Sequence, residues 1–396
     1  HGYQALYNNT TGEKNTAIGY QSMFANTTGE YNAAIGTDSL RANTTGEQNV
    51  ALGHNSLYNN TFGNGQVAAG YKSLFNNTTG NYNVGLGAYN LEANVSGSCN
   101  VAIGYEALNC NKASVNVAIG YQVLKENTTG TQNVGLGYGA LKCNTTGNSN
   151  VGVGLSALQA NTSGHSNIAI GMQALNSNTT GIRNVSIGYT SLRANTIGIN
   201  NVAVGNAAMY TNTTGTNNVA IGAYALYQNT TGIDNVALGR SAVACNTVGY
   251  QNIGIGLESL KANTTGFDNV SLGYKALTTN TTGGFNIAVG TEAGCSNTTG
   301  TANIVLGQCA FHNSQTGSSN VVLGHQAMHT GSGNIQSNVA IGTFAMYKGS
   351  NSCFNVAIGR DSGKCMNGGK CNVMLGYSSG CCISSGCSNV VLGTRS

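Results

Sequence analysis

Residues 184–200 read NVSIGYTSLRANTIGIN, and this pattern of seventeen residues returns along almost the whole chain. An asparagine opens nearly every copy, as at Asn32, Asn49 and Asn83, and is followed by an apolar residue, a small residue, an apolar residue and glycine. A fixed short period is typical of a solenoid, in which each copy forms one coil and buries its apolar face against its neighbours. The sequence therefore predicts an all-β solenoid, or β-roll, of about 23 coils with a 17-residue repeat.

The order of residue types within one copy predicts its local structure. Val and Ile alternate with a small residue at the start, which is the period of a strand. The glycine at the fifth position, Gly188 in the quoted copy, predicts a bend or bulge. The pair Ser191 and Leu192 predicts a second short strand. Asn-Thr-Thr-Gly, for which residues 195–198 read Asn-Thr-Ile-Gly, predicts a turn in which Asn caps its own backbone and Gly is free to adopt a positive φ.

Two changes of repeat length support this assignment. The copy that begins at Asn100 is one residue shorter than the usual seventeen, and the copy that begins at Asn320 is one residue longer. Both changes fall where the turn is expected, at residues 111–115 and 330–334. Loops tolerate such changes, whereas a one-residue slip in a strand would turn every side chain to the other face.

The second and fourth residues of each copy, such as Val101 and Ile103, are expected to point inward together with the ninth, such as Leu108. The third position would then face away from the interior, and it carries small residues throughout. A stripe of Ala and Gly lets another backbone approach closely, so we interpret it as an interface between parallel copies, most simply a three-fold one; the alternative is that small residues suit a crowded corner of the coil. The interface candidates are Ala17, Ala34, Ala51, Ala68, Gly85, Ala102, Ala118, Gly135, Gly152 and Ala169.

The composition argues for a repeat architecture without catalytic, nucleic-acid or membrane chemistry. Only 7% of the residues are charged, the net charge is +4, and the basic residues stand singly. No basic run predicts a nucleic-acid partner, and no apolar stretch reaches membrane-spanning length. The six histidines occupy different coil positions and the acids are scattered, so we expect neither an enzyme nor a cofactor. The chain begins and stops within a copy, so we expect a segment of something longer or a unit that stacks end to end.

Cysteines are dense in the last part of the chain, which we therefore divide into a regular solenoid over residues 1–289 and a Cys-rich continuation of the same solenoid over residues 290–396. In the Cys-rich part the ninth-position leucine is lost at Gly294, Gly363 and Gly380. A disulfide across the base of a turn would replace the missing packing and implies an oxidising, extracellular setting. The competing interpretation for Cys381, Cys382 and Cys387 is a zinc site. The candidate disulfide pairs are Cys365 with Cys371, Cys382 with Cys387, and Cys99 with Cys110.

Asn-Thr-Thr and its variants are also acceptor sequences for N-glycosylation. If they are modified, sugar would cover one edge of the solenoid. The alternative is that Asn and Thr suit a turn, and that a repeat copies one coincidence many times. The candidate acceptors are Asn9, Asn26, Asn43, Asn77, Asn127, Asn144, Asn161, Asn178, Asn212, Asn229, Asn263, Asn280 and Asn297.

Tyrosine recurs at the sixth position of many copies. Residues at one position of a solenoid lie above one another, so we expect a stacked structural ladder rather than a sugar-binding platform. The members are Tyr20, Tyr71, Tyr105, Tyr121, Tyr138, Tyr189 and Tyr274.

The unit Asn-Val-Ala-Ile-Gly-x-x-(Ala/Ser)-Leu resembles the head repeats of trimeric autotransporter adhesins (YadA-like) and similar repeats in phage and giant-virus fibre proteins. The resemblance covers essentially the whole chain and implies a left-handed β-roll, trimeric assembly and surface adhesion. Two features depart from that pattern. The period is longer because of the added Asn-Thr-Thr-Gly turn, and the Cys-rich end is foreign to bacterial adhesin heads.

We therefore expect an extracellular fibre protein of a cell or virion surface, with a structural and adhesin-like role. It would self-associate as a trimer or as an end-to-end filament, and surface glycans or a host receptor would be its other partners. The first alternative is a glycan-coated filament subunit without a specific receptor. The second is an ice-binding β-solenoid, in which ranked threonine hydroxyls would order water.

Overall fold

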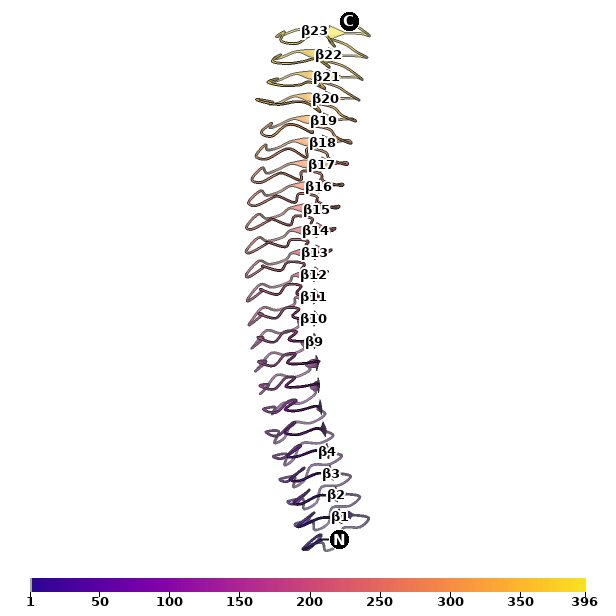
Figure 1. The fold of residues 1–396 in the computed structure, drawn as a ribbon, viewed down its shortest axis with the longest axis vertical. Coiled ribbons are helices and arrows are strands. Elements are labelled where there is room, and N and C mark those ends of the chain that lie inside the picture. Colours follow the sequence, from indigo (N-terminus) through magenta and orange to yellow (C-terminus); the bar gives the residue numbers. More distant parts are fainter. Residues whose placement is uncertain (1) are drawn as a thin grey trace. The chain divides into compact units, whose positions relative to one another are not determined.

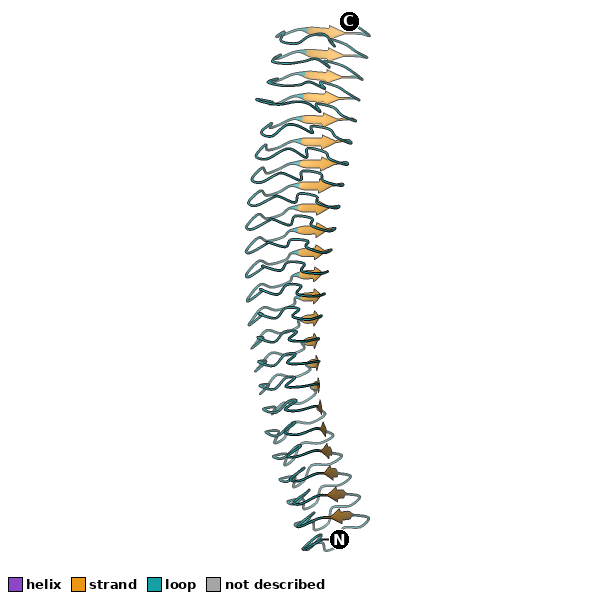
Figure 2. Ribbon diagram, viewed as in Figure 1, coloured by secondary structure: helices purple, strands orange, loops and turns teal. Residues whose placement is uncertain are grey.

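The computed structural model describes residues 2–396, and these contain 23 parallel strands and no helix. Each strand has three residues and occupies the second to fourth positions of one copy of the repeat. Turns and loops form the rest of each coil (Figure 2). The predicted fold class, an all-β solenoid with one coil per copy, is confirmed. Residues 2–396 include no helix of the length and apolarity that crossing a bilayer would require.

The chain forms two compact units, of which one ends at Gly198 and the other begins at Ile199. The first unit contains β1 (Thr16–Ile18), β2 (Ala33–Ile35), β3 (Val50–Leu52), β4 (Val67–Ala69), β5 (Val84–Leu86), β6 (Val101–Ile103), β7 (Val117–Ile119), β8 (Val134–Leu136), β9 (Val151–Val153), β10 (Ile168–Ile170) and β11 (Val185–Ile187). The second contains β12 (Val202–Val204), β13 (Val219–Ile221), β14 (Val236–Leu238), β15 (Ile253–Ile255), β16 (Val270–Leu272), β17 (Ile287–Val289), β18 (Ile304–Leu306), β19 (Val321–Leu323), β20 (Val339–Ile341), β21 (Val356–Ile358), β22 (Val373–Leu375) and β23 (Val390–Leu392). The compositional boundary expected at residue 290 lies inside the second unit and stays a prediction.

Within each unit, every strand pairs in parallel and in register with the strand of the next coil (Figure 1). The register survives both changes of repeat length, because Val101 pairs with Val117 and Val321 pairs with Val339. The lost and added residues are therefore absorbed in the turns, as predicted.

The middle residue of each strand points into the coil, which reverses the predicted orientation. Ala102 has no exposed surface, whereas Val101 and Ile103 on either side are only half-buried. The ninth-position leucine, such as Leu108, is fully buried as predicted. Because this leucine already fills the narrow interior, only a small residue fits opposite it at the third position.

The sizes of the inward residues compensate one another from coil to coil. A Cβ added to Gly135 would lie 2.4 Å from Cγ1 of Val123, which replaces the usual smaller eighth residue. Where the ninth leucine is lost at Gly363, the third position carries the buried Met374, and a Cβ on Gly363 would lie 2.8 Å from its Cε. The third, eighth and ninth positions therefore fill the core jointly, and a smaller residue at one of them is matched by a larger residue at another.

The predicted second strand is a turn. Its seventh and ninth residues adopt the left-handed conformation, as at Asp38 (φ 53°) and Leu40 (φ 51°). An L-residue in this region bends the chain sharply and cannot continue a strand. The backbone groups are nevertheless satisfied between coils, since the amide of Leu40 donates to the carbonyl of Ser56 at 2.9 Å.

Two ladders of buried asparagines hold the coils together. At the first position, the amide of Asn150 donates to Oδ1 of Asn133 at 3.0 Å, and Nδ2 of Asn150 donates to the Gly164 carbonyl at 2.8 Å. At the twelfth position, Nδ2 of Asn161 donates to Oδ1 of Asn144 at 2.7 Å and to the same Gly164 carbonyl at 2.9 Å. Each coil is thus closed on itself and tied to its neighbour by the same side chains.

Candidate functional site: an aliphatic outer face

The second and fourth residues of the repeat, which are the first and third residues of each strand, form one continuous surface on each unit, which we call the outer face. In the first unit it runs over β1–β11 and contains Val, Ile, Leu and Ala, with Thr16 as its one polar member. In the second unit it runs over β12–β23 and contains only Val, Ile and Leu. Not one position of these strands carries a charge.

The outer face exposes an unusually large number of aliphatic side chains to solvent. Ile35 is 44% exposed, Ile170 is 40% exposed, and Ile221 in the second unit is 44% exposed. Monomeric soluble proteins rarely expose contiguous apolar patches larger than about 300–600 Å². A stripe two side chains wide and eleven or twelve strands long therefore indicates an interaction surface.

A column of aromatic rings follows the outer face beyond the fifth-position glycine. The rings of Tyr105 and Tyr121 stack at a centroid distance of 5.5 Å, and those of Tyr121 and Tyr138 stack at 4.9 Å. Tyr20 stacks in the same way on Tyr3 at 5.6 Å. The predicted stacking of tyrosines is confirmed at these members.

Most charged pairs lie on the seventh and tenth positions, away from the outer face; the pair of Arg360 with Asp361 also uses the sixth position. Nζ of Lys125 lies 2.7 Å from Oε2 of Glu106, and Gln122 donates to the same oxygen at 2.7 Å. Burial alone would raise the pKa of Glu106, but the hydrogen bonds from Lys125 and Gln122 lower it below its ordinary value. Charge is thus retained on the coil but kept off the aliphatic surface.

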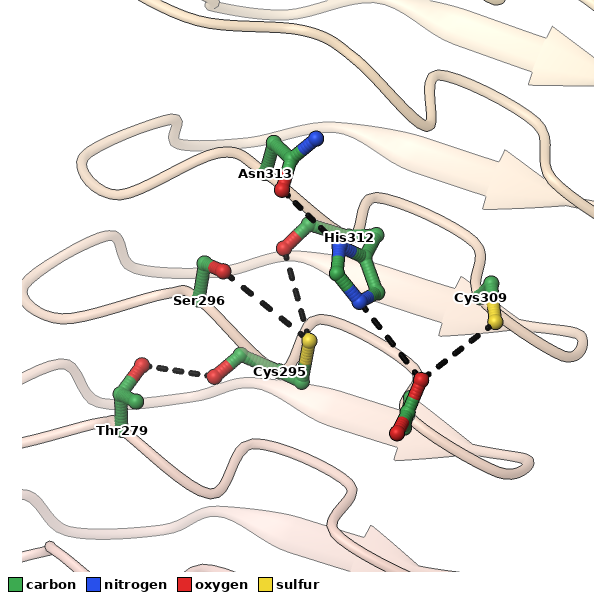
Figure 3. Close-up of polar contacts among 7 residues, drawn as sticks. Thr279, Cys295, Ser296, Cys309, His312 and Asn313 are labelled. Atoms are coloured by element: carbon green, nitrogen blue, oxygen red, sulfur yellow. Dashed lines mark hydrogen bonds and ion pairs between the residues drawn. The ribbon is translucent and has the colours of Figure 1, made fainter.

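One cluster brings thiols, a histidine and a carboxylate together in the second unit (Figure 3). Oε2 of Glu292 lies 3.6 Å from Nε2 of His312 and accepts from Sγ of Cys309 at 3.7 Å, while Sγ of Cys295 donates to the His312 carbonyl at 3.6 Å. Burial raises the pKa of the Cys295 thiol to about 11, and burial together with Glu292 raises the pKa of Cys309. Both thiols therefore stay protonated at neutral pH, and the thiolate is the nucleophilic form. Over residues 2–396, no three His, Cys, Asp or Glu side chains are placed to hold a metal ion.

The predicted interface column is wrong, because it lies inside the coil. The third position faces the interior, so its members cannot meet another chain. The affected residues are Ala17, Ala34, Ala51, Ala68, Gly85, Ala102, Ala118, Gly135, Gly152 and Ala169, all of them buried.

The structure also contradicts the glycosylation candidates. Apart from the half-buried Asn9, these asparagines are buried and belong to the twelfth-position ladder. Nδ2 of Asn144, for example, donates to Oδ1 of Asn127 at 2.8 Å and to the Gly147 carbonyl at 3.0 Å. Both hydrogens of the acceptor nitrogen are used in the interior, so a folded coil has no room for a sugar there. The contradicted acceptors are Asn26, Asn43, Asn77, Asn127, Asn144, Asn161, Asn178, Asn212, Asn229, Asn263, Asn280 and Asn297.

The predicted disulfides are not formed, since all twelve cysteines are free thiols. The two cysteines of each predicted pair occupy different positions of the coil. One is the eleventh residue of its copy, and the other is the sixteenth or seventeenth. In a solenoid the neighbour of a residue is the residue at the same position of the next coil. The unformed pairs are Cys365 with Cys371, Cys382 with Cys387, and Cys99 with Cys110.

The sequence alone could have located the outer face, but the alternation within the strand was not enough to do so. Alternation along three residues does not say which side is inside. The ninth leucine, together with the large residue that appears at the third position when this leucine is lost, shows that both positions share the interior. Taken together, these two columns would have placed the Val and Ile columns outside.

Fold and surface together define the chain as a β-solenoid with one continuous aliphatic face on each unit. Neither a protein-family model nor a curated protein sequence matches the chain.

Proposed function

We propose that this chain is a non-enzymatic structural fibre protein of a cell or virion surface, and that copies of it associate through their outer faces. The observation that carries the proposal is the aliphatic composition of the second and fourth repeat positions in both units, which over β1–β23 is interrupted by Thr16 alone. Exposed charges would be the ordinary means of keeping such a sheet soluble and monomeric.

The energetics favour a partner as long and as flat as the face itself. Full burial of a Val, Leu or Ile side chain is worth about 1.5–3 kcal/mol, so covering the remaining two-fifths of a fourth-position residue adds roughly 1 kcal/mol. Seven fourth-position residues in the first unit are exposed to this degree and give roughly 7 kcal/mol, to which the second-position column adds. Association costs about 4–15 kcal/mol, so a stable complex requires contact over most of the face.

A second copy of the chain meets this requirement. Its strands repeat at the same spacing of about 4.8 Å, so its side chains can interdigitate along the whole length of the face. The proposal keeps the expectation of self-association, as a trimer or a filament, and moves the interface from the third position to the second and fourth. Attachment to surface glycans or to a host receptor remains part of the proposed role.

The two alternative functions receive less support from the side chains concerned. A glycan coat would need the twelfth-position asparagines, which are buried. Ice binding would use ranks of free threonine hydroxyls, and one of the two threonine columns, the thirteenth position, already uses its hydroxyls between coils. Thr179 Oγ1, for example, donates to the Thr196 carbonyl at 3.1 Å.

The test introduces lysines on the face and compares them with lysines beside it. Leu136→Lys combined with Ile221→Lys places one charge in the fourth-position column of each unit. The matched control is Tyr138→Lys, which alters an exposed sixth-position residue two positions away. We expect the native chain and the control to be oligomeric by light scattering, and the double variant to be monomeric with an unchanged circular dichroism spectrum. A native chain that is monomeric at micromolar concentrations, or a double variant that stays oligomeric, would refute the proposed interface.

A further inference from the structure

The eleventh position of the coil places side chains of consecutive coils in direct contact. Nδ2 of Asn59 donates to Oδ1 of Asn76 at 3.0 Å, and these two residues are the eleventh members of neighbouring coils. Residues seventeen apart at this position are therefore within bonding range of one another.

Cys365 and Cys382 both occupy the eleventh position, on the coils that follow β21 and β22. They are the one pair among the twelve cysteines that shares a position on consecutive coils. The register between these coils is fixed by the Cys365 amide, which donates to the Cys381 carbonyl at 3.2 Å. Cys365 is half-buried and Cys382 is exposed, so a soluble reagent can reach the pair.

This cysteine pair lies where the twelfth-position ladder has ended. The last asparagine of the ladder is Asn297, whose Oδ1 is buried without a hydrogen-bond partner. The following coils carry no asparagine at this position and so lack its side-chain bond to the next coil. Their twelfth residues are Ser314, Gly331, Gly349, Met366 and Ile383.

We propose that Cys365 and Cys382 form a disulfide between consecutive coils when a small-molecule disulfide such as oxidised glutathione is present. One thiol loses its proton, and its sulfur attacks the oxidant, releasing one reduced thiol and leaving a mixed disulfide. The second thiolate then attacks the protein sulfur of that mixed disulfide and releases the other reduced thiol. The protein loses two electrons and two protons, and the oxidant gains both. The new bond takes over the coil-to-coil connection that the asparagine ladder makes elsewhere.

A competing partner for Cys382 is its neighbour Cys381, whose Sγ lies 3.6 Å from that of Cys382. Adjacent residues have Cα atoms about 3.8 Å apart, which is shorter than the usual disulfide span of about 4.4–6.8 Å. Equivalent residues of stacked coils lie about 4.8 Å apart, which falls within that span. Backbone geometry therefore favours the bond between coils.

The experiment maps the bonds in the folded, full-length chain after incubation with oxidised glutathione. Digestion with trypsin and chymotrypsin places Cys365, Cys371 and Cys382 on three different peptides, and fragmentation of the cross-linked pair separates Cys381 from Cys382. We expect a linkage between Cys365 and Cys382. Cys143 and Cys245 are matched controls at the same position without a cysteine on either neighbouring coil, and we expect them to lose their free thiols at least tenfold more slowly.

A second measurement tests the mechanical consequence. In the oxidised chain we expect the amides of β22 to exchange hydrogen at least tenfold more slowly than in the reduced chain, because β21 and β22 belong to the joined coils. Cys382→Ser should abolish this difference, whereas Cys371→Ser should preserve it. A dominant linkage from Cys381 to Cys382 or from Cys365 to Cys371, or oxidation no faster than at the control cysteines, would overturn the proposal.

Discussion

Removal of one asparagine from the twelfth-position ladder tests whether these residues are structural or serve as modification sites. Asn178 lies in the first unit, and its Nδ2 donates to Oδ1 of Asn161 at 2.8 Å and to the Gly181 carbonyl at 3.0 Å. Its own Oδ1 accepts from Nδ2 of Asn195 at 2.9 Å. The substitution Asn178→Ala removes all three bonds and leaves the backbone in place.

The expected cost follows from the groups that lose a partner. The Gly181 carbonyl keeps its hydrogen bond from Asn167 at 2.8 Å, so it stays satisfied. Oδ1 of Asn161 and one N–H of Asn195 are left buried and unpaired, and each such group costs about 1–3 kcal/mol. We expect Asn178→Ala to destabilise the coil by about 4 kcal/mol in total, the middle of that range for two groups.

The assay is hydrogen exchange of the amides in the coil around Asn178, in the full-length chain. A loss of about 4 kcal/mol corresponds to roughly a thousandfold faster exchange through local opening. The matched control is Thr180→Ala, which destroys the same glycosylation sequon at an exposed side chain and leaves the ladder intact. We expect that variant to differ from the native chain by less than about 0.5 kcal/mol.

Two results would refute this reasoning. If Asn178→Ala exchanges like the native chain, the ladder contributes no net stability. If Thr180→Ala and Asn178→Ala have equal effects when the chain is produced in a glycosylating host, the sequon matters rather than the buried hydrogen bonds.

Three further changes probe the coil. Gly171→Ala should prevent normal stacking, because at φ 132° its Cβ would lie 2.4 Å from the carbonyl oxygen of Gly188; a variant with native circular dichroism and stability would contradict this. Ala169→Leu should overpack the core and lower the free energy of unfolding by about 1–3 kcal/mol, whereas Ile170→Leu should change it by less than about 0.5 kcal/mol. Urea unfolding measures both variants. Equal losses of stability would contradict the inward orientation of the third position. The pKa of Cys295 is raised from 9.0 to about 11, so its contribution to stability is present below pH 9 and is lost as the pH rises towards 11; thiolate absorbance compared with Cys295→Ser checks this, and titration near 9 would contradict it.

The sequence alone determined the architecture, because periodicity survives any uncertainty about side-chain direction. The period predicts one coil per copy, and the two changes of length locate the turn correctly. The ninth-position leucine was correctly assigned to the core. Gln66, the one replacement of the first-position asparagine, keeps the ladder through the same bonds, since it accepts from the amide of Asn83 at 3.1 Å.

Only the tertiary structure decided which side of the strand faces inward. A three-residue strand with Val, Ala and Ile can present either its middle residue or its outer pair, and local alternation is satisfied both ways. The choice depends on the volume left by Leu at the ninth position and by the eighth residue, which is a property of the closed coil. A small interior selects the alanine and leaves the larger side chains outside.

The same limit applies to the asparagines and the cysteines. Asn-Thr-Thr is identical as a sequon and as a ladder element, and only the stacking of coils shows that Nδ2 of a residue such as Asn161 is enclosed. Cysteines such as Cys365 and Cys371 are close in sequence but lie at different coil positions, whereas Cys382 shares the position of Cys365 on the next coil. Contacts in this fold are set by the seventeen-residue wrap, because each residue packs against its equivalents above and below rather than against its neighbours along the chain.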